Sequence, residues 1–316
     1  MDDSTETLLY DSTAHRRLRR RRLGRRAYIR SVQFLPSLAT LGNAVCGFAA
    51  IYVAAFAMND AGNDPWAQFF ARHSFVAACY LIILSMVFDA LDGRLARFAR
   101  HTTDFGGQLD SLADAVSFGA APAFLALQVF KADGPTTVYM LSRLIWAAGA
   151  LYFACALVRL ARFNVSNEHG EQAHMSFLGL PSPGAAGAVV GVILMQQDLK
   201  LLAETHGWWL AWAGACFGVA LIPVVLVATG LLMVANIRYP HVINRYLRGR
   251  KPIARLIGLL AVLLIMVADL HHAHRYVFGI GALSFALGGA ISWMVTRSGR
   301  TQSATEGTLP AGGAAP

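Results

Sequence analysis

The chain has 316 residues, of which 56% are hydrophobic and 14% are charged, and it carries a formal net charge of +9. Its mean hydropathy is +0.48. This composition is typical of an integral membrane protein and argues against a water-soluble domain.

The first predicted element is a basic cytoplasmic segment over residues 1–32, which contains the run HRRLRRRRLGRR from His15 to Arg26. No apolar core precedes a small-residue cleavage site, so we do not interpret it as a signal peptide. An arginine run can bind nucleic acid or can simply determine topology. Beside a transmembrane helix we expect it to contact anionic lipid headgroups, and we expect no nucleic-acid partner.

Apolar segments of about 20 residues, the length that crosses a bilayer, then follow along the chain. The eight predicted spans cover 33–57, 75–99, 109–130, 138–162, 181–197, 207–235, 254–270 and 276–296. We therefore expect an all-α bundle of about eight transmembrane helices, forming one catalytic domain over 33–297. The remaining residues, 298–316, are rich in Gly, Ala, Thr and Ser and are expected to be disordered.

The distribution of basic residues predicts the orientation of this bundle. With the amino terminus inside, only 5 of the 27 Lys and Arg residues fall on the outer side, and 22 fall inside. This asymmetry follows the positive-inside rule. We therefore expect a multi-pass protein of the cell (inner) membrane with both termini in the cytoplasm.

Two polar residues lie three positions apart in the first span, Thr40 and Asn43, and so share one helical face. Polar residues inside membrane helices commonly form interhelical hydrogen bonds. A contact with a nucleotide or its phosphates is the functional alternative, and the sequence leaves both interpretations open.

Four carboxylates, Asp89, Asp92, Asp110 and Asp114, lie where the second span ends and the third begins. Spacings of three and four residues place each pair on one helical face, so two helices present four acids to one another. Each acid deep in a membrane helix costs roughly 2.5–3.5 kcal/mol, which a bound cation would offset. Hard oxygen ligands favour Mg²⁺ or Mn²⁺, and this many acids can hold two divalent ions. An ion path or a structural metal clip remains the alternative.

The stretch DALDGRLARFARHTTDFGGQLDSLAD, from Asp89 to Asp114, resembles the signature of the CDP-alcohol phosphotransferase family. The resemblance implies an integral membrane enzyme, expected to be a homodimer, that displaces CMP from a CDP-linked substrate. It also implies that Asp114 is the base and that all four acids bind metal. The positions implied to contact the CDP-linked lipid are Gly93, Ala96, Arg97 and Gly106, and we add Thr40 and Asn43.

Three flanking stretches narrow the choice of the substrate that accepts the transferred group. They are LPSLATLGNAVCGF, SLADAVSFGAAPA, and RLARFN followed by FLGLPSP. They resemble the bacterial-type membrane subfamily that makes phosphatidylserine, over about residues 33–240. The resemblance implies that CDP-diacylglycerol and L-serine are the substrates. Arg159 and Arg162, three residues apart, are candidates to bind the serine carboxylate, although they can also snorkel harmlessly. Glycerol 3-phosphate and an inositol phosphate remain alternative acceptors, and a divalent-cation transporter is the alternative from another class.

Overall fold

The computed structural model describes residues 38–57, 64–99, 104–133, 139–168, 179–237, 275–289 and 291. Regular structure in these ranges is entirely helical. The elements are a helix over Leu38–Phe56, α2 (Pro65–Ala99), α3 (Asp104–Asp114), the π-helical turn η1 (Ala115–Ala120), α4 (Ala121–Asp133), α5 (Tyr139–Glu168), α6 (Ser182–His206), α7 (Trp209–Val234) and a helix over 275–289.

Six segments of the described chain are long and apolar enough to cross a membrane, and α3, η1 and α4 together form one of them. They match the first six predicted spans, so the prediction of an all-helical membrane bundle is confirmed. The helix over 275–289 overlaps the eighth predicted span and begins one residue before it. The seventh, 254–270, lies outside the described residues, as do the segments 1–32 and 298–316.

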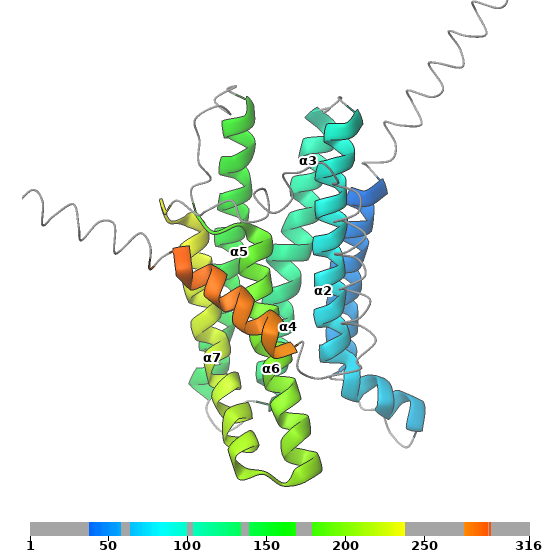
Figure 1. Ribbon diagram of the computed structural model, residues 1–316, viewed down its shortest axis with the longest axis vertical. Helices are drawn as coiled ribbons and strands as arrows, with labels where there is room; N and C mark the ends of the chain where they lie inside the picture. Colours follow the sequence, from blue (N-terminus) through cyan, green and yellow to red (C-terminus); the bar gives the residue numbers. More distant parts are fainter. Residues whose placement is uncertain are drawn as a thin grey trace, which may run out of the picture.

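The helices run alongside one another, so the ends of distant segments meet at one end of the bundle (Figure 1). The start of α3 and the carboxyl-terminal parts of α2 and α5 lie at the upper end in this view. The turn between α6 and α7 lies at the opposite end. This alternation brings residues from all six candidate spans to the upper end, where the acids lie.

The α2 helix begins at Pro65, earlier than the predicted start of 75, because a local cap stabilises its first turn. The Asp64 carboxylate accepts a hydrogen bond from the backbone N–H of Trp66 at 3.0 Å. Proline at the first helical position has the required φ angle and no N–H to leave unpaired. The cap therefore adds two to three helical turns before the predicted span.

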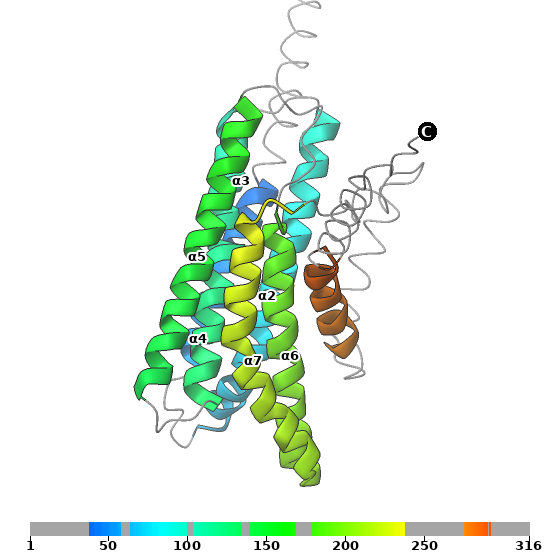
Figure 2. The ribbon, with the colours of Figure 1, turned by 90° about the vertical axis from the view of Figure 1, so that its left-hand side faces the viewer.

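The helix over 275–289 packs against α6 on the outside of the bundle, on the side away from α5 (Figure 2). The two backbones come close at a pair of glycines: a Cβ at Gly191 would lie 2.6 Å from the Cα of Gly279. Arg275 Nη1 and Asp198 Oδ1 form an ion pair of 3.1 Å between the same helices, and both side chains are buried. The charges of these two residues are therefore balanced inside the bundle.

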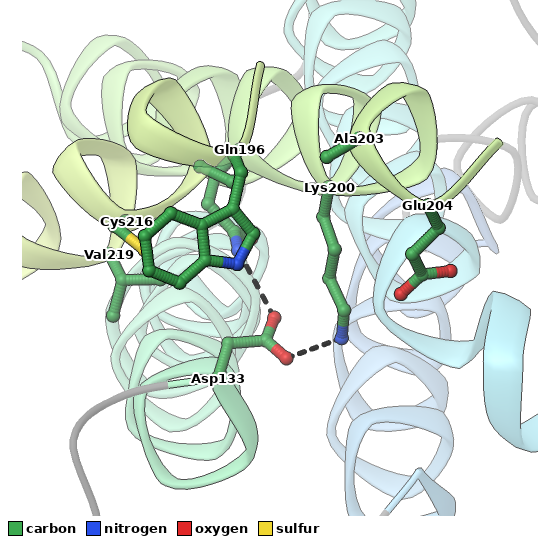
Figure 3. A pocket seen from close by; sticks show the side chains of 9 residues that line it. Asp133, Gln196, Lys200, Ala203, Glu204, Cys216 and Val219 are labelled. Atoms are coloured by element: carbon green, nitrogen blue, oxygen red, sulfur yellow. Dashed lines mark hydrogen bonds and ion pairs between the residues drawn. The ribbon is translucent and has the colours of Figure 1, made fainter. Parts of the chain in front are cut away.

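A polar network ties α4 to α6 near the end of the bundle that is opposite the acids (Figure 3). Asp133 accepts hydrogen bonds from Gln196 and Gln197 on one oxygen, and its other oxygen pairs with Lys200 at 2.5 Å. Asp133, Gln196 and Lys200 border a groove of about 240 Å³ that α7 completes. Because the carboxylate is already paired and hydrogen-bonded, this network serves to connect helices.

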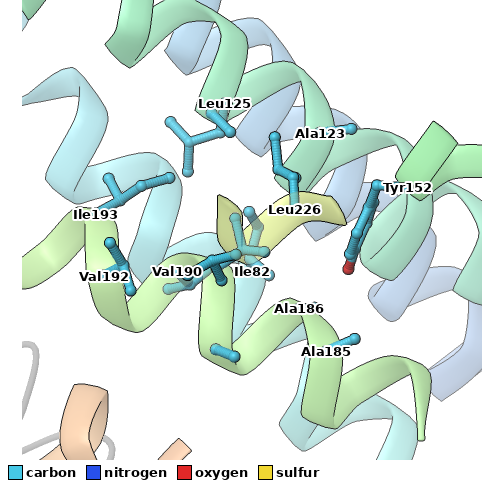
Figure 4. Packing of buried hydrophobic residues seen from close by; sticks show 14 of the residues in the cluster. Ile82, Ala123, Leu125, Tyr152, Ala185, Ala186, Val190, Val192, Ile193 and Leu226 are labelled. Carbon is cyan, nitrogen blue, oxygen red and sulfur yellow. The ribbon is translucent and has the colours of Figure 1, made fainter. Parts of the chain in front are cut away.

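The hydrophobic core fills the space between α2, α4, α5, α6 and α7 (Figure 4). Ile82, Leu125, Tyr152, Ile193 and Leu226 are among its fully buried side chains. Large residues of one helix face alanines and glycines of another, especially along α6, which allows close helix packing in a membrane. This packing holds the two acid-bearing helices in fixed positions.

The Leu38–Phe56 helix makes its closest approach to the η1 turn at Gly47. A Cβ at this position would lie 2.6 Å from the Cα of Ser117, so only glycine fits without separating the helices. The Ser117 hydroxyl donates a hydrogen bond of 2.8 Å to the carbonyl oxygen of Asn43 on that helix. Gly47 therefore allows the contact that aligns Asn43 with the acids.

We predict that Gly47→Ala will destabilise the protein by about 1–3 kcal/mol, the usual cost of overpacking a filled core. The measurement is the melting temperature of the purified protein in detergent. Gly281→Ala is the matched control, since no atom of the described residues lies within 4 Å of the position that its Cβ would take. Equal melting temperatures for the two variants would contradict the close packing at Gly47.

Candidate active site

Three of the four predicted acids meet at one point between two helices. Asp89 of α2 and Asp110 and Asp114 of α3 each offer a carboxylate oxygen, and these oxygens lie within 4.8 Å of one another. The spacing of three and four residues in the sequence directs the side chains across the helix–helix interface, as predicted. The arrangement has the size and the hard oxygen donors of a divalent-cation site.

Asp92 lies beside this trio. It is 7% exposed and accepts a short hydrogen bond from the Thr40 hydroxyl. It is also close enough to Asp89 and Asp110 to interact with both electrostatically. Asp92 therefore adds a fourth negative charge to the same end of the bundle.

The first helix contributes Asn43, which is fully buried beside Asp114. Its Nδ2 donates a hydrogen bond of 3.0 Å to Asp114 Oδ1. Thr40 and Asn43 thus form the interhelical hydrogen bonds that the sequence offered as one interpretation. Asn43 Oδ1 is buried and has no hydrogen-bond partner within the described residues. A buried acceptor without a donor is costly, so this oxygen is available to a cation or a ligand donor.

Within the described residues, the acids of this site differ from two other buried acids of the bundle in forming no ion pair with a basic side chain. Asp133 pairs with Lys200, and Asp198 pairs with Arg275. In the part of the chain that the structure describes, no ion pair of 4.0 Å or less joins Asp89, Asp110 or Asp114 to a basic side chain. Their concentrated negative charge thus calls for a cation from outside the chain.

The two candidate arginines at the end of α5 have different surroundings. Arg159 Nη1 donates to the Ser182 hydroxyl at 3.0 Å, and its Nε is buried without a partner among the described residues. It is also near enough to Asp114 to interact electrostatically. Arg162 is more exposed and donates to the Val234 carbonyl oxygen and to Asn236 Oδ1. Arg159 therefore faces the acids, whereas Arg162 holds the end of α7.

The start of α6 is joined to the end of α7 through a backbone conformation that glycine favours. Gly179 has a φ of 88°, and its N–H donates to the Ile237 carbonyl oxygen at 2.8 Å. The next N–H, of Leu180, donates to the Leu232 carbonyl oxygen at 2.9 Å. Gly179 and Leu180, which belong to the FLGLPSP stretch, thus contact the end of α7. Their contact places Ser182 beside Arg159.

Other predicted site residues lie around the acids or outside the described part. Around Gly93, no described atom lies within 4 Å of the position that a Cβ would take, so space is open there. Gly106 is partly buried in the first turn of α3. The side chains of Ala96 and Arg97 lie outside the described part of the structure, so their predicted contacts with the CDP-linked lipid remain predictions.

Several polar contacts near the acids were not predicted from the sequence. Ser111 donates to Asn164 Oδ1 at 2.8 Å, which joins α3 to α5. Tyr152 donates to the Phe118 carbonyl oxygen in η1 at 2.9 Å. Asn164 and Phe118 belong to stretches that the sequence had already marked, but Tyr152 lies in an apolar helix and carries no such signal. A proline within the third span, Pro122, was the one available sign of an irregular helix.

The sequence model described as "CDP-alcohol phosphatidyltransferase" matches residues 33–220 of this chain. The chain is also similar to three proteins named CDP-diacylglycerol–serine O-phosphatidyltransferase. The Helicobacter pylori protein (strain 26695) is 36% identical over 172 residues, which are 54% of this chain and 63% of that protein. The Mycobacterium tuberculosis protein (strain H37Rv) is 31% identical over 184 residues, 57% of this chain and 56% of that protein.

The Bacillus subtilis protein is 28% identical over 211 residues, 66% of this chain and 92% of that protein. For the first two relatives, the matched region therefore covers less than two thirds of their length. The family match begins before the Leu38–Phe56 helix and extends into α7, so it includes all four acids.

Proposed function

This chain belongs to the CDP-alcohol phosphatidyltransferase family, and we propose that it transfers the phosphatidyl group from CDP-diacylglycerol to L-serine, releasing CMP. The products would be phosphatidylserine and CMP, in phospholipid biosynthesis. The names of the three relatives support serine as the acceptor. The observation that carries the chemistry is the trio of acids, none of which forms an ion pair with a basic side chain among the described residues, since such a cluster is suited to a cation.

We propose that Asp89, Asp92, Asp110 and Asp114 hold Mg²⁺ or Mn²⁺, with two divalent ions in the complete site. The carboxylate oxygens within 4.8 Å of one another fit such an ion, and Asn43 Oδ1 is a further oxygen nearby. When bound, the cations would stabilise the negative charge of the diphosphate and of the departing CMP. The open space around Gly93 would let the diphosphate approach the backbone of α2.

The reaction that we propose is one displacement at phosphorus. The serine hydroxyl oxygen attacks the phosphorus that carries diacylglycerol, and the bond from that phosphorus to the CMP oxygen breaks. Asp114 accepts the hydroxyl proton, because serine is a weak nucleophile at neutral pH. Asn43 holds Asp114 Oδ1 through its hydrogen bond, which leaves Oδ2 for the proton. No covalent enzyme intermediate is needed.

The topology that we propose determines on which side of the membrane the site lies. The acids lie at the bundle end that the positive-inside asymmetry assigns to the cytoplasm, where soluble serine is present. CDP-diacylglycerol would enter sideways from the inner leaflet of the cell membrane. A homodimer and a contact of the His15–Arg26 run with anionic lipids are parts of the same proposal.

We predict that the purified protein will release CMP from CDP-diacylglycerol only when serine and Mg²⁺ or Mn²⁺ are both present, and that a chelator will abolish release. Glycerol 3-phosphate and inositol phosphate are tested in parallel. Turnover with either one and not with serine would disprove the acceptor while leaving the family chemistry intact. Movement of a divalent cation into liposomes, with no consumption of CDP-diacylglycerol, would instead support the alternative that this protein is a divalent-cation transporter.

We predict that Asp114→Asn will lower turnover by roughly 10²–10⁴-fold, the usual contribution of a positioned base, while CDP-diacylglycerol still binds. Asp89→Asn should instead weaken metal-dependent binding of the lipid, because it removes only a ligand. The measurement is CDP-diacylglycerol binding at several Mn²⁺ concentrations, alongside turnover. If Asp114→Asn loses binding as severely as Asp89→Asn, Asp114 acts chiefly as a ligand.

We predict that Arg159→Gln will raise the KM for serine by roughly tenfold or more, as expected for a charge-assisted hydrogen bond, with little change for the lipid. Arg159 has a buried Nε without a partner among the described residues, and it interacts electrostatically with Asp114. Arg162→Gln is the comparison, since Arg162 donates to the end of α7. A larger rise for Arg162→Gln would reassign the serine carboxylate to that residue, and no rise in either variant would leave both without a role in serine binding.

A further inference from the structure

The helix that carries Asp110 and Asp114 changes its winding directly after the second acid. In the η1 turn, the backbone N–H of Ala121 donates to the carbonyl oxygen of Val116, five residues earlier. A regular α-helix would use the carbonyl four residues earlier. Single π-helical turns inside α-helices occur frequently at functional sites. The cause of this one lies in two residues outside the acid cluster.

The first residue is Pro122, the second residue of α4. Proline has no backbone N–H, and its ring clashes with the carbonyl four residues earlier in a regular helix. That carbonyl belongs to Phe118, in the middle of η1. The wider π-helical turn relieves the clash, but Pro122 cannot donate to the Phe118 oxygen.

The second residue is Tyr152 of α5, which supplies a hydrogen bond to that oxygen. Its hydroxyl donates to the Phe118 carbonyl oxygen at 2.9 Å, and both side chains are fully buried. Figure 4 shows Tyr152 within the core. On another side of η1, Ser117 donates to the Asn43 carbonyl oxygen. The turn is thus held by the Leu38–Phe56 helix and by α5.

The winding of this turn decides which way the acids face. Each residue of an α-helix rotates the chain by about 100°, and a π-helical turn accommodates one extra residue. The buried side of α4 carries Leu125 and Val129. Relative to that side, the acids therefore point about 100° away from the direction that they would have in an unbroken helix. With α4 packed as it is, an unbroken helix would turn Asp110 and Asp114 away from Asp89.

We propose that Tyr152 is a positioning residue, whose hydroxyl holds the π-helical turn set by Pro122 and so directs Asp110 and Asp114 toward the cation site. This proposal rests on one part of the proposed function, which is that the acids bind a divalent cation. It extends the site to α5 through a side chain whose hydroxyl contacts the backbone of η1.

The first test is Tyr152→Phe, which keeps the buried ring and removes only the hydroxyl. Binding of Mn²⁺ to the full-length purified protein is measured directly, from the paramagnetic resonance signal of the free ion, without substrates. We expect the dissociation constant to rise about tenfold, as is common when a group that orients a ligand is removed. Tyr52→Phe is the matched control, because Tyr52 is exposed on the Leu38–Phe56 helix, and it should bind Mn²⁺ as the wild type does.

The second test is Pro122→Ala, which separates positioning from general stability. Alanine restores an N–H that can donate to Phe118 and favours a regular helix, so the melting temperature should stay the same or rise. Mn²⁺ binding should nevertheless weaken about tenfold, because the acids turn away. If the turn served only to stabilise the fold, Pro122→Ala would not weaken Mn²⁺ binding while keeping or raising the melting temperature.

Wild-type Mn²⁺ affinity in both variants would overturn the proposal, as would a loss of melting temperature in Tyr152→Phe without a loss of affinity. If Tyr152→Phe does not fold, Pro122→Ala alone decides the question. Wild-type protein that binds Mn²⁺ but does not consume CDP-diacylglycerol would disprove the proposed reaction and leave this inference standing. Wild-type protein that binds no Mn²⁺ would overturn both.

Discussion

Four carboxylates at one end of an apolar helix bundle are the constraint on which the rest of this structure depends. Each one is costly to bury, and no basic side chain of the described chain forms an ion pair with Asp89, Asp110 or Asp114. Hydrogen bonds from neutral donors offset part of this cost. Thr40 donates to Asp92, and Asn43 donates to Asp114. The remaining negative charge is suited to a divalent cation. Two other buried acids, Asp133 and Asp198, do form ion pairs with Lys200 and Arg275, so among the described residues the lack of ion pairs is specific to this site.

The helices around the site are held by contacts that do not use the acid side chains. Gly47 lets the first helix approach η1, and the hydrogen bonds of Gly179 and Leu180 join α6 to α7. Arg162 adds a second connection to the end of α7. These contacts lie at the same end of the bundle as the acids. A frame built from close helix contacts is what a cation site needs in order to keep its geometry.

The two ends of the bundle therefore have different electrostatic characters. At the end away from the acids, Asp133 is satisfied by Lys200, Gln196 and Gln197, and the groove beside it has its carboxylate already neutralised. At the acid end, the Asn43 oxygen and the Arg159 Nε are buried without partners among the described residues. An unpaired acceptor and an unpaired donor at this end can each bind a polar group of a ligand.

The sequence by itself determined the membrane class, the positions of six spans and the two pairs of acids, because hydropathy and helical spacing are local properties. It also carried the signature of the family, which depends on residue types at fixed intervals. Only the tertiary structure decided that Asp89, Asp110 and Asp114 form the closest group, and that Arg159 faces them while Arg162 does not. The predicted third span was an unbroken helix, whereas the chain contains a π-helical turn. That turn depends on a hydroxyl of α5, 34 residues from its acceptor, and helical periodicity contains no information about a contact between residues so far apart.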